Sequence, residues 1–133
     1  MSKSPTQTIM RSGLGRARGL GSAKTGAAHW FAERATGLAL VPLTLWFIYS
    51  VLSLLGAPRA AVVAWGGHTV NATLLLALVL IMFHHMSMGL QVVMEDYIHS
   101  EKRRLVSVLL MKAVVGLFGL AATLAIIKLA LVG

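Results

Sequence analysis

The sequence predicts an all-α integral membrane protein with three transmembrane helices. Of its 133 residues, 57% are hydrophobic and only 12% are charged, whereas a soluble domain carries about a quarter charged residues. The apolar residues gather in three long runs, each close to or above the roughly 20 residues that a helix needs to cross a bilayer core. Backbone groups in lipid must be hydrogen-bonded within the protein, and these runs lack the alternation of barrel strands, so helices are predicted.

The three spans are expected at about residues 36–55, 71–94 and 105–131. Pro42 lies inside the first span and is expected to kink it, because proline lacks a backbone N–H. The segment between the first two spans contains glycines and a proline, which break helices, so we expect an irregular loop there.

The basic residues are distributed unevenly around these spans. Those before the first span are Lys3, Arg11, Arg16, Arg18, Lys24 and Arg34, the first loop has Arg59, and the second loop has Lys102, Arg103 and Arg104. By the positive-inside rule, the N-terminus and the second loop face the cytoplasm, and the first loop and the C-terminus face the opposite side. We therefore expect a cytoplasmic basic arm and lead-in at residues 1–33 and a membrane anchor at residues 34–133. Basic residues next to a span favour topology and headgroup attraction over nucleic-acid binding.

The N-terminal segment and the absence of cysteine narrow the class further. Residues 1–28 contain arginine and serine but no acid, as transit peptides do; we expect instead a retained arm of a bacterial inner-membrane protein. The chain has no cysteine, which excludes disulfides, iron–sulfur clusters ligated by this chain and covalent haem attachment.

Two adjacent histidines, His84 and His85, lie inside the second apolar run. Ionisable residues at membrane depth are costly and therefore mark functional sites. Neighbouring helix positions point about 100° apart, so only one of the pair can face a given ligand. For His84 we expect a packing hydrogen bond to another helix. For His85 the alternatives are such a bond, a proton relay or an axial haem ligand, and one histidine fills only one axial position.

Two further polar groups lie near the span ends. Asp96 and Tyr97 end the second run; tyrosine is common at membrane interfaces, but a phenol beside a carboxylate can also donate to a quinone carbonyl. Arg34 lies where the first run begins, so it either extends to lipid headgroups or faces an anionic group between helices, such as a haem propionate.

The pattern His85-x3-Gly89-x6-Asp96-Tyr97-x-His99 resembles the second transmembrane helix of the small D-type membrane-anchor subunits of succinate dehydrogenase, respiratory complex II. The lead-in, with its His29-Trp30 and Arg34-Ala35-Thr36 segments, is also similar to that family, especially to its alphaproteobacterial and mitochondrial-type members.

The resemblance implies a role for each candidate residue. It implies His85 as an axial ligand of haem b and Arg34 near the haem propionates and the quinone. Tyr97 would hydrogen-bond ubiquinone, with Asp96 supporting that tyrosine. The chain would form half of a helical bundle that a C-type cytochrome b anchor subunit completes.

The resemblance also implies a mechanism shared with partner chains. A flavoprotein subunit would oxidise succinate, an iron–sulfur subunit would carry the electrons, and ubiquinone would receive them near the cytoplasmic interface. This chain alone would catalyse nothing. The alternative function is a non-redox membrane protein, such as a proton-coupled transporter subunit that uses the intramembrane histidines and Asp96 as a relay.

Overall fold

The computed structural model describes residues 24–132, and the regular secondary structure of this part of the chain is all helical. Its elements are α2 (Lys24–Ser53), α3 (Arg59–Gly67), α4 (Thr69–Tyr97) and α5 (Glu101–Val132). The three long helices, α2, α4 and α5, are long and apolar enough to cross a membrane. The prediction of an all-α protein with three apolar spans is therefore confirmed.

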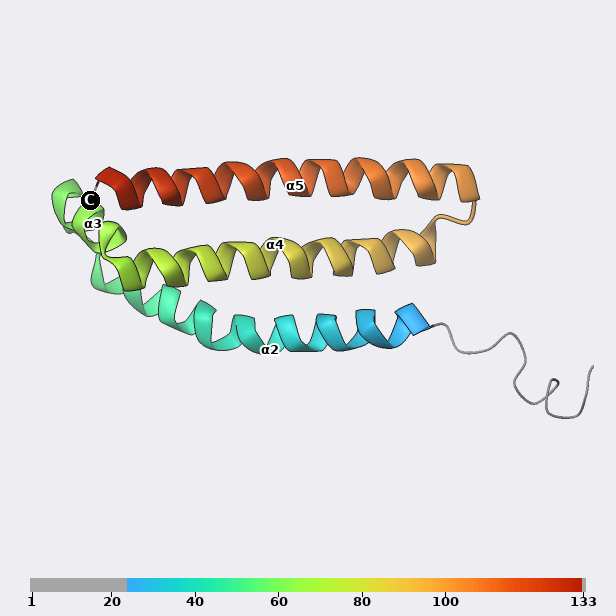
Figure 1. Ribbon diagram of the computed structural model, residues 1–133, viewed down its shortest axis with the longest axis horizontal. Helices are drawn as coiled ribbons and strands as arrows, with labels where there is room; N and C mark the ends of the chain where they lie inside the picture. Colours follow the sequence, from blue (N-terminus) through green and yellow to red (C-terminus); the bar gives the residue numbers. More distant parts are fainter. Residues whose placement is uncertain (1–23, 133) are drawn as a thin grey trace, which may run out of the picture.

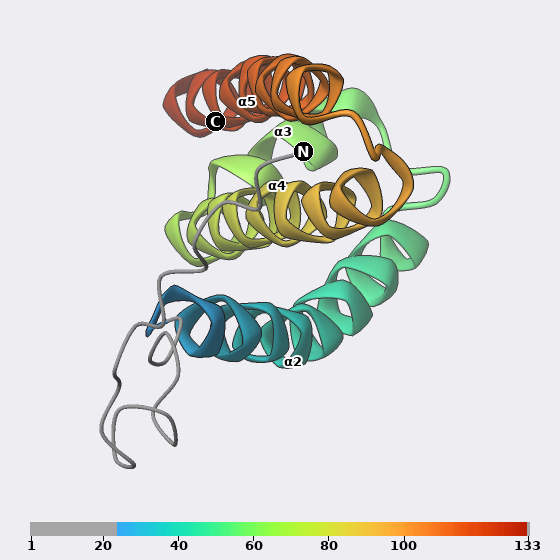
Figure 2. The same ribbon diagram turned by 90° about the vertical axis from the view of Figure 1, so that its right-hand side faces the viewer.

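The long helices form a single layer in which α4 lies between α2 and α5 (Figure 1). α4 packs against both neighbours, whereas α2 and α5 make no close backbone approach to each other in the described residues. Figure 2 shows the same order from the end of the layer and the curvature of α2, which contains Pro42. One layer of helices leaves two broad faces uncovered.

The uncovered faces are apolar. Six hydrophobic residues are buried, and no side chain in the described residues is fully buried. The buried set is Ala72, Leu75, Leu78, Met88, Met111 and Val115. Exposed apolar surface on this scale requires lipid or a partner subunit to cover it.

The segment between the first two spans differs from the expected irregular loop. Gly56 adopts a positive φ of 76°, which glycine tolerates without steric cost, and the chain then forms the short helix α3. Trp65 of α3 stacks on Trp46 of α2 with ring centroids 5.9 Å apart. The Asn71 side chain donates to the Trp65 carbonyl at 2.8 Å. These contacts hold α3 across one end of the layer.

All three long helices extend beyond the expected spans. α2 begins at Lys24, so the lead-in that contains His29 and Arg34 is helical, and the expected boundary after residue 33 falls inside this helix. Hydropathy marks only the segment matched to the hydrocarbon core, and a helix can continue into the headgroup region. The basic arm up to residue 23 lies outside the described residues.

Candidate functional site around His85

His85 of α4 contacts Thr36 of α2. The Nδ1 atom of His85 lies 2.9 Å from the Thr36 hydroxyl oxygen. That hydroxyl also lies 2.7 Å from the Ala32 carbonyl oxygen and 3.1 Å from the Glu33 carbonyl oxygen, both one turn earlier in α2. The α2–α4 contact therefore includes a polar link between the two helices.

The proton count of this cluster favours one tautomer of His85. A threonine hydroxyl has one proton, and a carbonyl oxygen can only accept. The short distance to Ala32 directs the Thr36 proton to that carbonyl, so the hydroxyl accepts a hydrogen bond from Nδ1–H of His85. The Nε2 atom is then unprotonated and carries its lone pair outside the ring. A histidine held this way is prepared to bind a metal through Nε2.

Two glycines shape the space around the imidazole. A Cβ atom at Gly37 of α2 would lie 3.3 Å from Cε1 of His85, so glycine allows α2 to approach the ring closely. A Cβ atom at Gly89, one turn further along α4, would meet nothing within 4 Å. The ring is therefore confined on the α2 side, while α4 is open at Gly89.

Gly89 belongs to an exposed stripe of α4. Met82, Met86, Val93 and Tyr97 are exposed, and with Gly89 they recur at the i, i+4, i+7 spacing that places residues on one helix face. His85 lies beside this stripe, which is long enough to accept a flat ligand or a partner helix.

A bare metal ion has no site in the described residues, because no three histidine, cysteine or acidic side chains converge there. A haem does not need such a cluster, because its porphyrin supplies the equatorial ligands and the protein supplies an axial imidazole. The single His85, with Nε2 free and open space at Gly89, fits that requirement.

The structure does not bring Arg34 to His85. Arg34 is exposed, and its guanidinium lies 3.9 Å from the centroid of the Trp30 ring. It precedes Thr36 by two residues and so points about 200° around α2 from the side that contacts His85. The observed partner of Arg34 is an aromatic ring, as is common for guanidinium groups.

Asp96 and Tyr97 lie at the other end of the candidate region. Both are exposed, and 80% of Tyr97 is accessible. Tyr97 follows His85 by twelve positions of one helix, about 18 Å along its axis. The structure therefore separates the imidazole from the acid–phenol pair along one helix.

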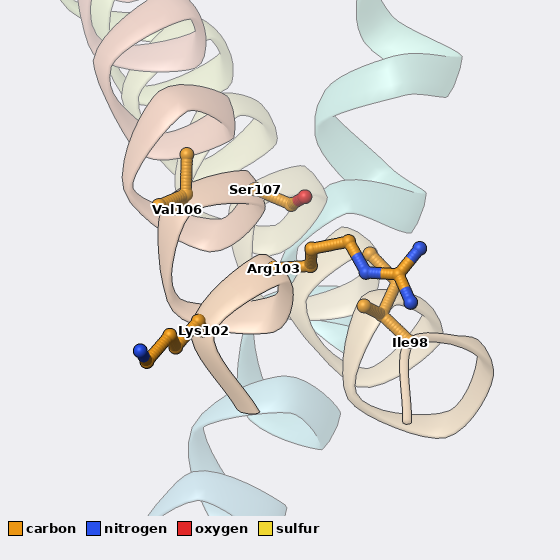
Figure 3. A pocket seen from close by; sticks show the side chains of 5 residues that line it. All are labelled: Ile98, Lys102, Arg103, Val106 and Ser107. Carbon is orange, nitrogen blue, oxygen red and sulfur yellow. The ribbon is translucent and has the colours of Figure 1, made fainter. Parts of the chain in front are cut away.

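A cavity of about 430 Å³ lies beside the turn that follows Tyr97. In Figure 3 the Arg103 side chain extends toward Ile98, whereas Lys102 points away to the other side. Val106 and Ser107 complete the lining. Two cations at this end of the helices give the region beside Tyr97 a positive rim.

For His84 the sequence predicted a packing hydrogen bond to another helix. The structure gives His84 no interhelical hydrogen bond in the described part of the chain; the residue is exposed and lines cavities together with Lys112 of α5. Sequence reasoning also missed Thr36 and Gly37 as neighbours of His85. Thr36 is a polar residue near the start of the first span, and this is the one sequence signal that could have drawn attention to it. A single sequence does not show which faces of two helices are in contact.

Comparisons with known proteins agree with this arrangement. Residues 8–119 match the family described as "Succinate dehydrogenase/Fumarate reductase transmembrane subunit". The chain is similar to the succinate dehydrogenase hydrophobic membrane anchor subunit of Rickettsia bellii, with 34% identity over 71% of this chain and 75% of the relative. The corresponding Rickettsia conorii subunit is 36% identical over 67% of this chain and 71% of the relative.

A third relative is the succinate dehydrogenase membrane anchor subunit of Reclinomonas americana, which is 28% identical over 68% of this chain and 78% of the relative. No solved structure matches the chain.

Proposed function

The chain belongs to the family of succinate dehydrogenase and fumarate reductase transmembrane subunits, and from this premise we propose that it supplies one axial ligand of haem b and part of a ubiquinone site. As a multi-pass membrane-anchor subunit of succinate dehydrogenase, it is not catalytic by itself. The proposal concerns which of its residues serve the assembled enzyme.

The observation that carries the haem proposal is the contact between His85 Nδ1 and Thr36. In this proposal the Thr36 hydroxyl accepts a hydrogen bond from Nδ1–H, and Nε2 is the ligand atom. In metal sites, a hydrogen bond from the ring nitrogen that does not bind the metal fixes the orientation of the ligating histidine. When bound, haem b would store an electron close to the quinone. His85 supplies one axial nitrogen, and the other must come from a partner chain.

The exposed stripe of α4 supports a C-type cytochrome b anchor subunit as that partner. Small and flexible side chains such as Gly89 and Met86 allow close helix packing in lipid, and Gly89 has open space in front of it. We propose that the partner helices cover this face and complete the bundle around the haem. Arg34 would meet a haem propionate or the quinone vicinity once they are in place, giving up part of its contact with Trp30.

Tyr97 and Asp96 are proposed to form the chain's share of the ubiquinone site. The exposed phenol at the end of α4 can donate a hydrogen bond to a quinone carbonyl. The adjacent Asp96 is proposed to support Tyr97 at this site. Electrons would arrive from iron–sulfur and flavoprotein subunits that dock at this end, where Lys102 and Arg103 lie.

The proposed location is the bacterial inner membrane, with residues 1–33 cytoplasmic and the C-terminus periplasmic. Its support is the positive-inside rule, because the basic residues gather before and within the first turns of α2 and in the first turn of α5.

The visible spectrum of the purified complex tests the haem proposal. We expect reduced-minus-oxidised bands of a b-type haem, and we expect acidified acetone to extract that haem from the protein, because it is held without covalent bonds. A complex that contains this chain and all its partners but shows no haem bands would contradict the haem proposal. The role of the chain as a membrane anchor would be unaffected.

A further inference from the structure

A second polar cluster lies on the side of α4 away from Gly89. His84, Ser87 and Gln91 recur at i, i+3 and i+7 and so form a stripe on one side of the helix. Together with His29 of α2 and Lys112 of α5, they line a cavity of about 540 Å³. The remaining wall is formed by Ala28, Ala32 and Met88. Residues from all three long helices thus surround one cavity that the haem and quinone proposals do not use.

Lys112 has no acidic partner in this cavity. The whole chain contains only four acids, Glu33, Glu95, Asp96 and Glu101, and none of them lines the cavity. Glu95 accepts a hydrogen bond from the Gln91 amide at 2.7 Å and lines a different cavity with Glu101 and Arg104. Lys112 is exposed, and charged side chains in transmembrane segments pair with other groups or extend to the interface. An anionic partner for Lys112 in this cavity would therefore come from outside the chain.

The polar cavity continues into a more apolar groove between α4 and α5. This groove, of about 380 Å³, shares His84, Ser87 and Lys112 with the cavity. Beyond them it is lined mostly by apolar residues, which are Leu80, Phe83, Val115, Gly116, Gly119 and Leu120, with Thr123 at the end. The groove therefore runs from the lysine toward the membrane centre, away from the turn between α4 and α5.

We propose that this composite site binds an anionic phospholipid of the leaflet on the side of the α4–α5 turn. The phosphate is placed between Lys112, His84 and His29, and one acyl chain fills the groove. Lys112 follows Arg104 by eight residues, about 12 Å along α5, and its long side chain can extend toward the headgroup region while its stem stays in apolar surroundings. Basic pockets between transmembrane helices bind anionic headgroups in this way.

Two other occupants satisfy only part of the site. A quinone has an apolar tail for the groove, but its uncharged head cannot neutralise Lys112. An acidic side chain of a partner subunit neutralises Lys112 but does not fill the groove. An anionic phospholipid supplies both the charge and the chain.

The test measures lipid bound to the complete enzyme complex. The complex is delipidated and reconstituted into nanodiscs of phosphatidylcholine with or without phosphatidylglycerol, re-extracted in mild detergent, and analysed for bound lipid by mass spectrometry. We expect wild type to retain phosphatidylglycerol in preference to phosphatidylcholine. Lys112→Gln should weaken that retention about fivefold, and Lys112→Arg should preserve it.

Lys128→Gln is the matched control, because Lys128 is an exposed lysine of the same helix that lines none of these cavities; it should retain lipid as wild type does. Inorganic phosphate should not displace the lipid, because the groove requires an acyl chain. Equal retention by Lys112→Gln and wild type would overturn the proposal. So would selective loss of ubiquinone from Lys112→Gln, or a carbodiimide cross-link between Lys112 and a partner carboxylate in a lipid-free complex.

Discussion

The hydrogen bond between His85 and Thr36 is the contact on which the proposed haem ligation by His85 rests. A neutral imidazole has one protonated and one unprotonated nitrogen, and the neighbour of the protonated nitrogen fixes which atom remains for a ligand. The Thr36 hydroxyl can accept a hydrogen bond from Nδ1–H because its own proton can be donated to the Ala32 carbonyl, 2.7 Å away. In this arrangement His85, the Thr36 hydroxyl and the Ala32 carbonyl leave Nε2 available to a ligand, and none of the three groups needs to be charged.

Replacing Thr36 tests this positioning role. Thr36→Val keeps the shape of the side chain but removes the acceptor, so the Nδ1 proton loses its partner. We expect haem to dissociate from the complex about 10–100-fold more readily, as is usual when an outer hydrogen bond to a ligating histidine is removed. Thr36→Ser retains the hydroxyl and should retain haem like wild type. Haem content after competition with apomyoglobin measures the difference; equal loss from the valine and serine variants would contradict the role assigned to the hydroxyl.

Tyr97 belongs to the quinone proposal and can be tested apart from haem. Tyr97→Phe removes the phenolic hydroxyl, which we propose donates to a quinone carbonyl. A hydrogen bond of this kind contributes about 0.5–1.5 kcal/mol, so quinone reduction should fall about two- to tenfold. Electron transfer from succinate to an artificial acceptor that accepts electrons upstream should be unchanged. Parallel losses in both assays would instead indicate faulty assembly.

At the scale of the helices, hydropathy located each span but not its ends or its neighbours. The three apolar runs became α2, α4 and α5, each extended beyond the hydrocarbon segment. The short helix α3 was missed because Gly66 and Gly67 read as breakers, yet they end the helix. A Cβ atom at Gly66 would collide with the Leu129 side chain, so this glycine lets α3 lie against α5.

The candidate site was only partly predictable for the same reason. An imidazole in an apolar run is rare, which marks the pair His84 and His85, and the resemblance to the second helix of the family selected His85 as the predicted ligand. The pairing with Thr36 and Gly37 depends on which sides of α2 and α4 meet, and one sequence contains no signal for that. The sequence placed Arg34 correctly at the start of the first span but could not show its direction. Its guanidinium lies over the Trp30 ring and does not face His85.

At the scale of the whole molecule, the chain is one layer of helices with two uncovered faces. The face with Gly89 and Tyr97 suits a partner anchor subunit, and the face with Lys112 suits lipid. The net charge of +8 concentrates near one membrane surface and predicts the orientation. A phosphatase fused to the C-terminus should be active, because it would lie in the periplasm; activity only from an N-terminal fusion would reverse the proposed topology.

The assignment of His85 as the haem ligand is tested most directly by comparing two neighbouring histidine variants. In complexes purified with all partner subunits, His85→Ala should abolish or strongly alter the reduced-minus-oxidised spectrum of the b-type haem. His84→Ala changes the adjacent residue, which points about 100° away along the same helix, and should leave that spectrum unchanged. An intact haem spectrum in His85→Ala together with its loss in His84→Ala would contradict the account.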